Sequence, residues 1–217
     1  SRTWDINEMP RLYKKSGFLF PYRNILIETI RNTFYHIPLW FSMFILFFGA
    51  MIMNVKYLQK KNIDDDHKAS SLITAGILMG CLGLVTGSIW AKNTWGAYWT
   101  TDVKLNMSAI SMMIYFAYVI LRSSMDDVDK RARISSAYSI FAFFTIVPLI
   151  FVIPRITDSL HPGNGGNPAF GGEDMDNTMR MVFYPAIIGF TLLGTWIASL
   201  VLRIKRLNEK VHLKMME

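Results

Sequence analysis

The chain has 217 residues, of which 52% are hydrophobic and only 18% are charged. This composition excludes an ordinary soluble domain and indicates an all-α, polytopic membrane protein. The formal net charge of +7 does not indicate nucleic-acid binding, because Lys and Arg cluster at the ends of apolar runs, a pattern typical of membrane topology.

The N-terminal part, residues 1–35, is polar and mixed in character. Its short apolar patches do not approach the roughly 20 residues that are needed to span a bilayer. We therefore expect an interfacial segment there. Residues 36–206 form the predicted transmembrane domain, and residues 207–217 form a basic cytoplasmic tail.

Five apolar runs follow the N-terminal segment, and each is close to the ~20 residues that cover the hydrocarbon layer. The predicted spans are residues 37–56, 71–90, 104–122, 134–153 and 181–203. The connection 57–70 contains three consecutive aspartates before His67, which predicts a solvated turn rather than a metal site.

The distribution of Lys and Arg predicts the orientation of these spans. Thirteen of them fall on the side that carries connections 57–70 and 123–133 and the C-terminus, and four fall on the other side beyond the N-terminal segment. The richer side is expected to be cytoplasmic. The outer side then carries loop 91–103 and loop 154–180.

Loop 91–103 contains the octet Trp95-Gly96-Ala97-Tyr98-Trp99-Thr100-Thr101-Asp102. Aromatic rings favour the membrane surface, and Thr101 or Asp102 is suited to cap the next helix, so a simple aromatic belt explains the pattern. A flat aromatic shelf for a planar, apolar ligand with acidic edges explains it equally well.

This octet, with His36 and His161 on the same side, resembles the tryptophan-rich WWD signature of heme-handling proteins in cytochrome c biogenesis. The chain most resembles the heme exporter protein C (CcmC) type, from about Ile30 to Arg206. That family usually has six spans, so its first span is expected to be absent here. The family also often carries Trp where this chain has Tyr98 and Thr101.

The resemblance implies that His36 and His161 are axial ligands of one heme iron. It also implies that the octet contacts the porphyrin, through Trp95, Gly96, Tyr98, Trp99 and Asp102. Taken singly, each histidine is explained as an interfacial or loop residue. For Asp102 the roles of helix cap and functional carboxylate both remain open.

Three outer-side cations, Lys104, Arg155 and Arg180, are candidate partners of the heme propionates, and membrane anchoring explains them equally well. The Gly-rich part of loop 154–180 is expected to form a flap over a site that holds and then releases heme. Cys81 is the single cysteine, so no covalent heme attachment motif is present. We therefore expect transient, non-covalent binding of heme b.

The resulting hypothesis is a non-enzymatic heme carrier of the bacterial inner membrane, with its site on the periplasmic side. The resemblance implies two partners, a periplasmic heme chaperone of the CcmE type and the ATP-binding-cassette (ABC) transporter subunits of the maturation system. One alternative is a cytochrome c heme lyase with the same signature, which usually has more spans. Another is a b-type electron-transfer cytochrome, which favours histidines inside the spans, and the predicted spans contain none.

Overall fold

The structure, a computed structural model, describes residues 31–161, 175 and 177–216, without the side chains of residues 212, 213 and 216. All regular structure in these residues is helical, which confirms the all-α prediction. The elements are α2 (Thr33–Lys60), α3 (Ile63–Trp95), α4 (Val103–Ser123), α5 (Val128–Val147), η2 (Pro148–Val152), α6 (Ile153–Ile156) and α7 (Asn177–Met216).

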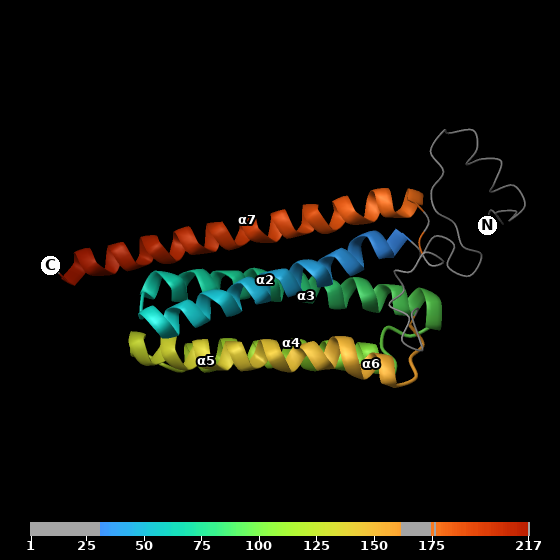
Figure 1. Ribbon diagram of the computed structural model, residues 1–217, viewed down its shortest axis with the longest axis horizontal. Helices are drawn as coiled ribbons and strands as arrows, with labels where there is room; N and C mark the ends of the chain where they lie inside the picture. The colour runs from blue at the N-terminus through green and yellow to red at the C-terminus, as the bar shows by residue number, and fades with distance from the viewer. Residues whose placement is uncertain (1–30, 162–174, 176, 217) are drawn as a thin grey trace, which may run out of the picture.

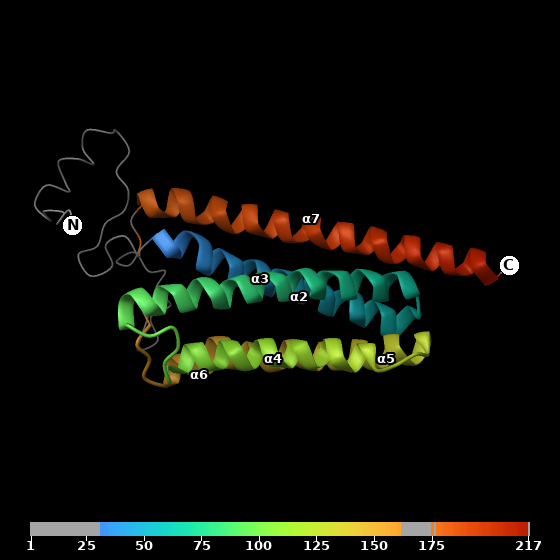
Figure 2. The same cartoon turned by 180° about the vertical axis from the view of Figure 1, so that it is seen from behind.

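The long helices run side by side and alternate in direction (Figures 1 and 2). Helix α7 lies on one side of the α2–α3 pair, and α4 and α5 lie on the other side. The connection 96–102, residues 157–161 and the start of α7 are therefore at one end of the bundle, and the short connections 61–62 and 124–127 are at the opposite end. The first of these ends is the predicted outer end.

Five stretches of the described chain are helices long and apolar enough to cross a membrane, and each contains one predicted span. The helices extend well beyond those spans, since α3 has 33 residues, or about 50 Å at 1.5 Å per residue. The polypeptide is therefore a multi-pass membrane protein. The predicted tail 207–217 continues α7 as far as Met216.

Side-chain caps fix where three of the helices begin. The side chains of Asn62, Asp102 and Asp127 accept hydrogen bonds from backbone N–H groups in the first turns of α3, α4 and α5, respectively. These N–H groups have no partner within their helix, so the caps stabilise the helix starts.

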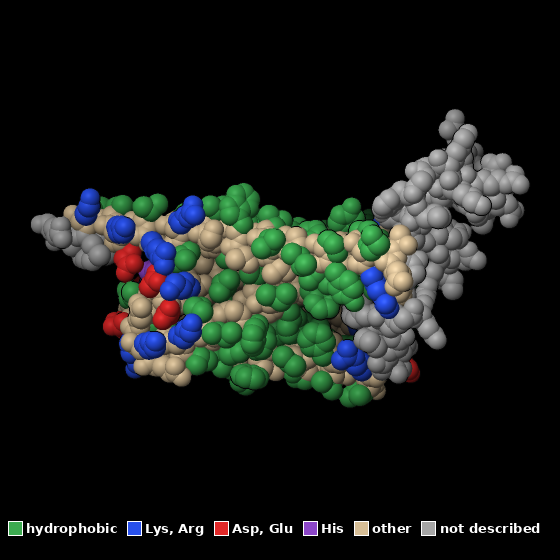
Figure 3. Space-filling model, turned by 45° about the horizontal axis from the view of Figure 1, so that its top comes forward, with side chains coloured by type: hydrophobic (Ala, Val, Ile, Leu, Met, Phe, Trp, Pro, Cys, Tyr) green, Lys and Arg blue, Asp and Glu red, His purple; other side chains and the backbone are tan. Residues whose placement is uncertain are grey.

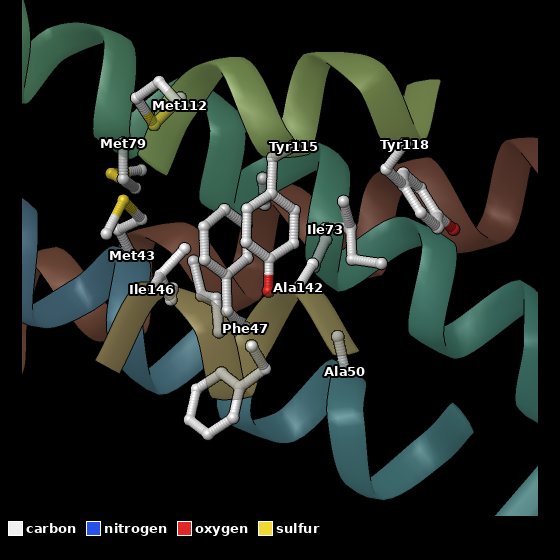
Figure 4. Close-up of a cluster of buried hydrophobic side chains, with 14 of the residues drawn as sticks. Met43, Phe47, Ala50, Ile73, Met79, Met112, Tyr115, Tyr118, Ala142 and Ile146 are labelled. Atoms are coloured by element: carbon white, nitrogen blue, oxygen red, sulfur yellow. The ribbon is translucent and has the colours of Figure 1, made fainter. Parts of the chain in front are cut away.

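The core lies where α2, α3, α4 and α5 meet (Figure 4). The rings of Phe47 and Tyr115 stack there, with centroids 3.6 Å apart and planes inclined by 8°. Glycines of α3 make the close approach possible, since a Cβ atom at Gly83 would lie 2.9 Å from Cε2 of Trp40. Small residues of this kind allow membrane helices to pack backbone to backbone.

The expected solvated turn at 57–70 is wrong, because α2 continues to Lys60 and α3 begins at Ile63. The aspartates occupy the first turn of α3. Asp65 pairs with Lys68 of the same helix, whereas Asp64 and Asp66 pair with cations from other helices. Arg122 donates two hydrogen bonds to the buried carboxylate of Asp66, at 2.8 and 2.6 Å. Arg206 donates two to Asp64. Figure 3 shows acidic and basic side chains gathered at one end of the molecule, beyond an apolar middle.

The fourth predicted span, 134–153, is not one regular helix. It runs through α5, the π-helical segment η2 and the single turn α6. Pro148 begins η2 and has no backbone N–H to donate, so the regular ladder of hydrogen bonds is interrupted there.

Candidate functional site

The candidate site lies at the predicted outer end of the bundle, where α2 begins and α3 ends. The predicted outer loop 91–103 is shorter in the structure, because α3 continues to Trp95 and Gly96 ends it with a positive φ of 81°. The predicted loop 154–180 is also shorter, since residues 154–156 belong to α6 and residues 177–180 to α7. Its Gly-rich part, residues 162–174, lies outside the described residues.

His36 lies one turn inside α2 rather than at its end. Its Nδ1 atom is 2.9 Å from the backbone carbonyl oxygen of Gly83 and 3.2 Å from the hydroxyl of Thr86. A carbonyl oxygen only accepts, so Nδ1 carries the proton and donates it to Gly83. The remaining ring nitrogen, Nε2, then keeps its lone pair, as a metal-ligating imidazole requires.

Glycines on α3 leave room for this imidazole. A Cβ atom at Gly87 would lie 2.7 Å from Cε1 of His36 and 3.5 Å from Nε2. Sequence reasoning missed this contribution. The spacing of Gly83 and Gly87, one helical turn apart, was the available signal.

Asp102 acts both as a helix cap and as the anchor of the second outer connection. Its Oδ1 atom accepts hydrogen bonds from the backbone N–H groups of Lys104 and Leu105, at 2.9 and 3.3 Å. Its Oδ2 atom accepts from the Ser159 hydroxyl at 2.8 Å and from the Leu160 N–H at 2.7 Å. The carboxylate therefore joins α4 to residues that are 57 and 58 positions away in sequence.

The same carboxylate also holds His161. Its Oδ1 atom lies 2.8 Å from Nδ1 of His161, and the side-chain exposures are 0% for Asp102 and 16% for His161. Burial works to raise the pKa of Asp102, but hydrogen bonds from Ser159, Leu160 and His161 outweigh it, so this pKa lies below its ordinary value. The carboxylate is thus ionised at neutral pH.

His161 itself is neutral at pH 7. Burial lowers its pKa below the ordinary value, and the raising effect of Asp102 only partly offsets this. A neutral imidazole next to a carboxylate donates its Nδ1 proton to it, which leaves Nε2 as the free lone pair. The two histidines therefore present the same nitrogen, Nε2, for a metal.

Aromatic rings surround His161. The centroid of the Trp95 ring is 4.8 Å away at an interplanar angle of 78°, and that of Trp90 is 5.6 Å away at 33°. Sequence reasoning missed Trp90, whose separation of five residues from Trp95 along a helical run was the only signal. The site therefore has a Trp–His–Trp cluster, defined by Trp90, His161 and Trp95.

The other octet aromatics do not join this cluster in the described structure. Tyr98 and Trp99 are 61% and 44% exposed. The Trp99 indole donates a hydrogen bond to Asn106 at 3.2 Å, and the ammonium group of Lys92 lies 5.5 Å above the Tyr98 ring. The expected single shelf is thus divided between a partly buried ring, Trp95, and two exposed rings.

Two of the three predicted cations lie near the Asp102–His161 pair. Lys104 follows Asp102 in the first turn of α4 and interacts electrostatically with both His161 and Arg155. Arg155 lies on α6 and donates a hydrogen bond to the carbonyl of Phe151 at 2.8 Å. Arg180 lies in the first turn of α7, on a different wall of the same end of the bundle.

The remaining histidines lie at the opposite end of the bundle. His67 is in the first turns of α3, 3.6 Å from a carboxylate oxygen of Glu209, and His212 is near the end of α7. The prediction that the spans contain no histidine is wrong, because α2 includes His36 and α3 includes His67. That absence no longer argues against a b-type cytochrome, although His161 still lies outside the spans.

A protein-family model and two relatives that cover most of this chain agree on one family. The family model described as heme exporter protein C (CcmC) matches residues 18–217. The heme exporter protein C of Bradyrhizobium diazoefficiens is 28% identical over 196 residues, covering 87% of this chain and 72% of the relative. That of Paracoccus denitrificans is 24% identical, covering 86% and 76%. The cytochrome c biogenesis protein CcsA of Prochlorococcus marinus is 35% identical over 81 residues, which is 37% of this chain and 26% of the relative.

Proposed function

Because this chain belongs to the heme exporter protein C family, we propose that it is a heme-handling membrane protein of cytochrome c maturation. It holds heme between His36 and His161 at the outer surface and passes it to a periplasmic heme chaperone of the CcmE type. The main support for the proposal is that both imidazoles have the same tautomer. Each uses Nδ1–H in a hydrogen bond and keeps the Nε2 lone pair for iron.

The surroundings of the two histidines suit a porphyrin. Trp90 and Trp95 supply apolar surface beside His161, and burial of apolar area contributes about 25 cal/mol per Å². Gly96, Tyr98 and Trp99 complete the outer surface. Lys104, Arg155 and Arg180 supply positive charge for the propionates.

The heme is cargo rather than a resident group. The single cysteine of the chain, Cys81, lies within α3, which supports non-covalent binding, and heme b is the expected form. A carrier needs a site that opens, and the position of His161 in a connection between helices supports release. The chain therefore acts as a transfer protein rather than as a catalyst.

The proposed setting is the bacterial inner membrane, with the heme site facing the periplasm. The distribution of Lys and Arg supports this orientation. The expected partners are the chaperone and the ABC transporter subunits of the same system. The local similarity to CcsA is the one observation that favours a heme lyase. It covers only 26% of that relative, so a heme carrier remains the preferred function.

The test is the absorption spectrum of the purified protein with heme. Two imidazole ligands give a low-spin iron spectrum, and His36→Ala and His161→Ala should each replace it with a high-spin or water-ligated spectrum and reduce transfer to the chaperone. His67→Ala is the matched control, because it removes an imidazole at the other end of the bundle. If both outer variants keep the parent spectrum and full transfer, the proposal is wrong.

A further inference from the structure

We propose that Asp102 is a positioning residue that makes His161 the stronger of two unequal iron ligands, so that the bond to His36 opens first on release. This inference rests on the proposed heme function. It concerns the order in which the two iron–nitrogen bonds break.

The two imidazoles differ in the acceptor that their Nδ1–H groups meet. His36 donates to a neutral carbonyl oxygen of Gly83 at 2.9 Å, whereas His161 donates to a carboxylate at 2.8 Å. An anionic acceptor makes a stronger hydrogen bond and raises the basicity of the opposite ring nitrogen. Nε2 of His161 is therefore the better donor to iron.

The carboxylate is fixed in place. Four hydrogen bonds besides that of His161 hold its two oxygens, and they come from both α4 and the connection 157–161. Its side chain is fully buried. A carboxylate that accepts five hydrogen bonds in a water-excluded position acts strongly on a nearby ion, because little solvent screens it.

The charge also distinguishes the two oxidation states of iron. Ferric heme with two neutral imidazoles carries one more positive charge than ferrous heme, so the Asp102 carboxylate stabilises the ferric form more. Hydrogen bonding to an axial ligand is one of the means by which a protein sets the heme potential. Among the residues that the structure describes, the hydrogen-bond partners of the His36 ring are the carbonyl of Gly83 and the hydroxyl of Thr86, and neither is an anion.

The first experiment measures the midpoint potential of bound heme in Asp102→Asn. Asn preserves a good helix cap but removes the charge, and loss of such an outer partner typically costs about 10- to 100-fold in metal affinity. We expect the preference for ferric over ferrous heme to fall about tenfold, which raises the potential by about 59 mV for a one-electron couple.

The matched control is Ser159→Ala. It removes one hydrogen bond to Oδ2 of Asp102 and loosens the connection, but the charge and the contact with His161 remain. It should not raise the potential. An unchanged potential in Asp102→Asn, or an equal rise in Ser159→Ala, overturns the proposal.

A second measurement does not depend on how Asp102→Asn folds. It compares the affinity for ferric heme of His36→Ala, which keeps His161, with that of His161→Ala, which keeps His36. We expect at least about tenfold tighter binding by His36→Ala, and equal affinities overturn the proposal. If instead neither variant alters the heme spectrum, the proposed function itself has failed.

Discussion

The close packing of Gly87 against His36 makes Gly87→Ala the sharpest test of the site geometry. The added Cβ would lie 2.7 Å from Cε1 and 3.3 Å from Nδ1 of the imidazole, whereas ordinary carbon–carbon contact is about 3.5–4.0 Å. The ring must therefore move by about 0.8 Å or more to restore that contact distance. Such a displacement strains its 2.9 Å hydrogen bond to Gly83 and redirects Nε2.

Overpacking of this kind costs about 1–3 kcal/mol. If this cost falls on the heme-bound geometry, heme affinity falls about 5- to 150-fold, since about 1.4 kcal/mol corresponds to a factor of ten. Replacement of a helical glycine by alanine also gains about 1 kcal/mol of helix propensity. The variant is therefore expected to insert normally and to show its defect in heme binding.

The assay is a heme titration of the purified variant, followed by its absorption spectrum and its thermal unfolding in detergent. The matched control is Gly189→Ala on α7, where the added Cβ meets nothing within 4 Å. Gly189→Ala should bind heme like the parent. Parent-like affinity and spectrum in Gly87→Ala would show that the approach of α3 does not set the position of His36.

Three further predictions concern other parts of the chain. Arg122→Ala leaves the buried Asp66 carboxylate unpaired and should lower the free energy of unfolding by about 3–5 kcal/mol, as measured by thermal denaturation. The double variant Arg122→Ala, Asp66→Asn should recover part of this stability, and no recovery would contradict this account. Trp95→Ala should weaken heme binding more than Trp99→Ala, because the Trp95 ring lies 4.8 Å from an imidazole while Trp99 is 44% exposed; equal losses in a heme titration would refute it. A reporter inserted in residues 163–172 should be periplasmic and one fused after the C-terminus cytoplasmic, and the opposite result would invert the orientation.

The fold was predictable from hydrophobicity, because a stretch of about 20 apolar residues has few alternatives to a membrane helix. The helix ends were less predictable. Composition alone predicts a loop at polar residues such as Asp64. They are helical because Arg206 and other cations from distant helices pair with them. Tertiary pairing of this kind has no local signal.

The same limit applies to the site. The types of residue and their common membrane side identified His36, His161 and Asp102 from the sequence. The two roles proposed for Asp102 could not be separated, since its hydrogen bonds to residues 159–161 depend on how α4 and the second outer connection meet in space. Trp90 was missed because an isolated Trp near a helix end is also typical of an interfacial anchor.

The two ends of the bundle differ in the contacts that hold the helices together, and this difference determines which end unfolds locally at the lower free energy. At one end, Arg122 and Arg206 tie α4 and α7 to the start of α3 through paired hydrogen bonds. At the other, η2 interrupts the hydrogen-bond ladder below α6, and the side chain of Asp102 carries the connection 157–161. Free energies of local opening vary across a folded protein in this way. Backbone amides of residues 153–161 should therefore exchange their protons with solvent sooner than those of residues 67–75, and opening of this segment moves His161, with the heme bound to it, away from His36.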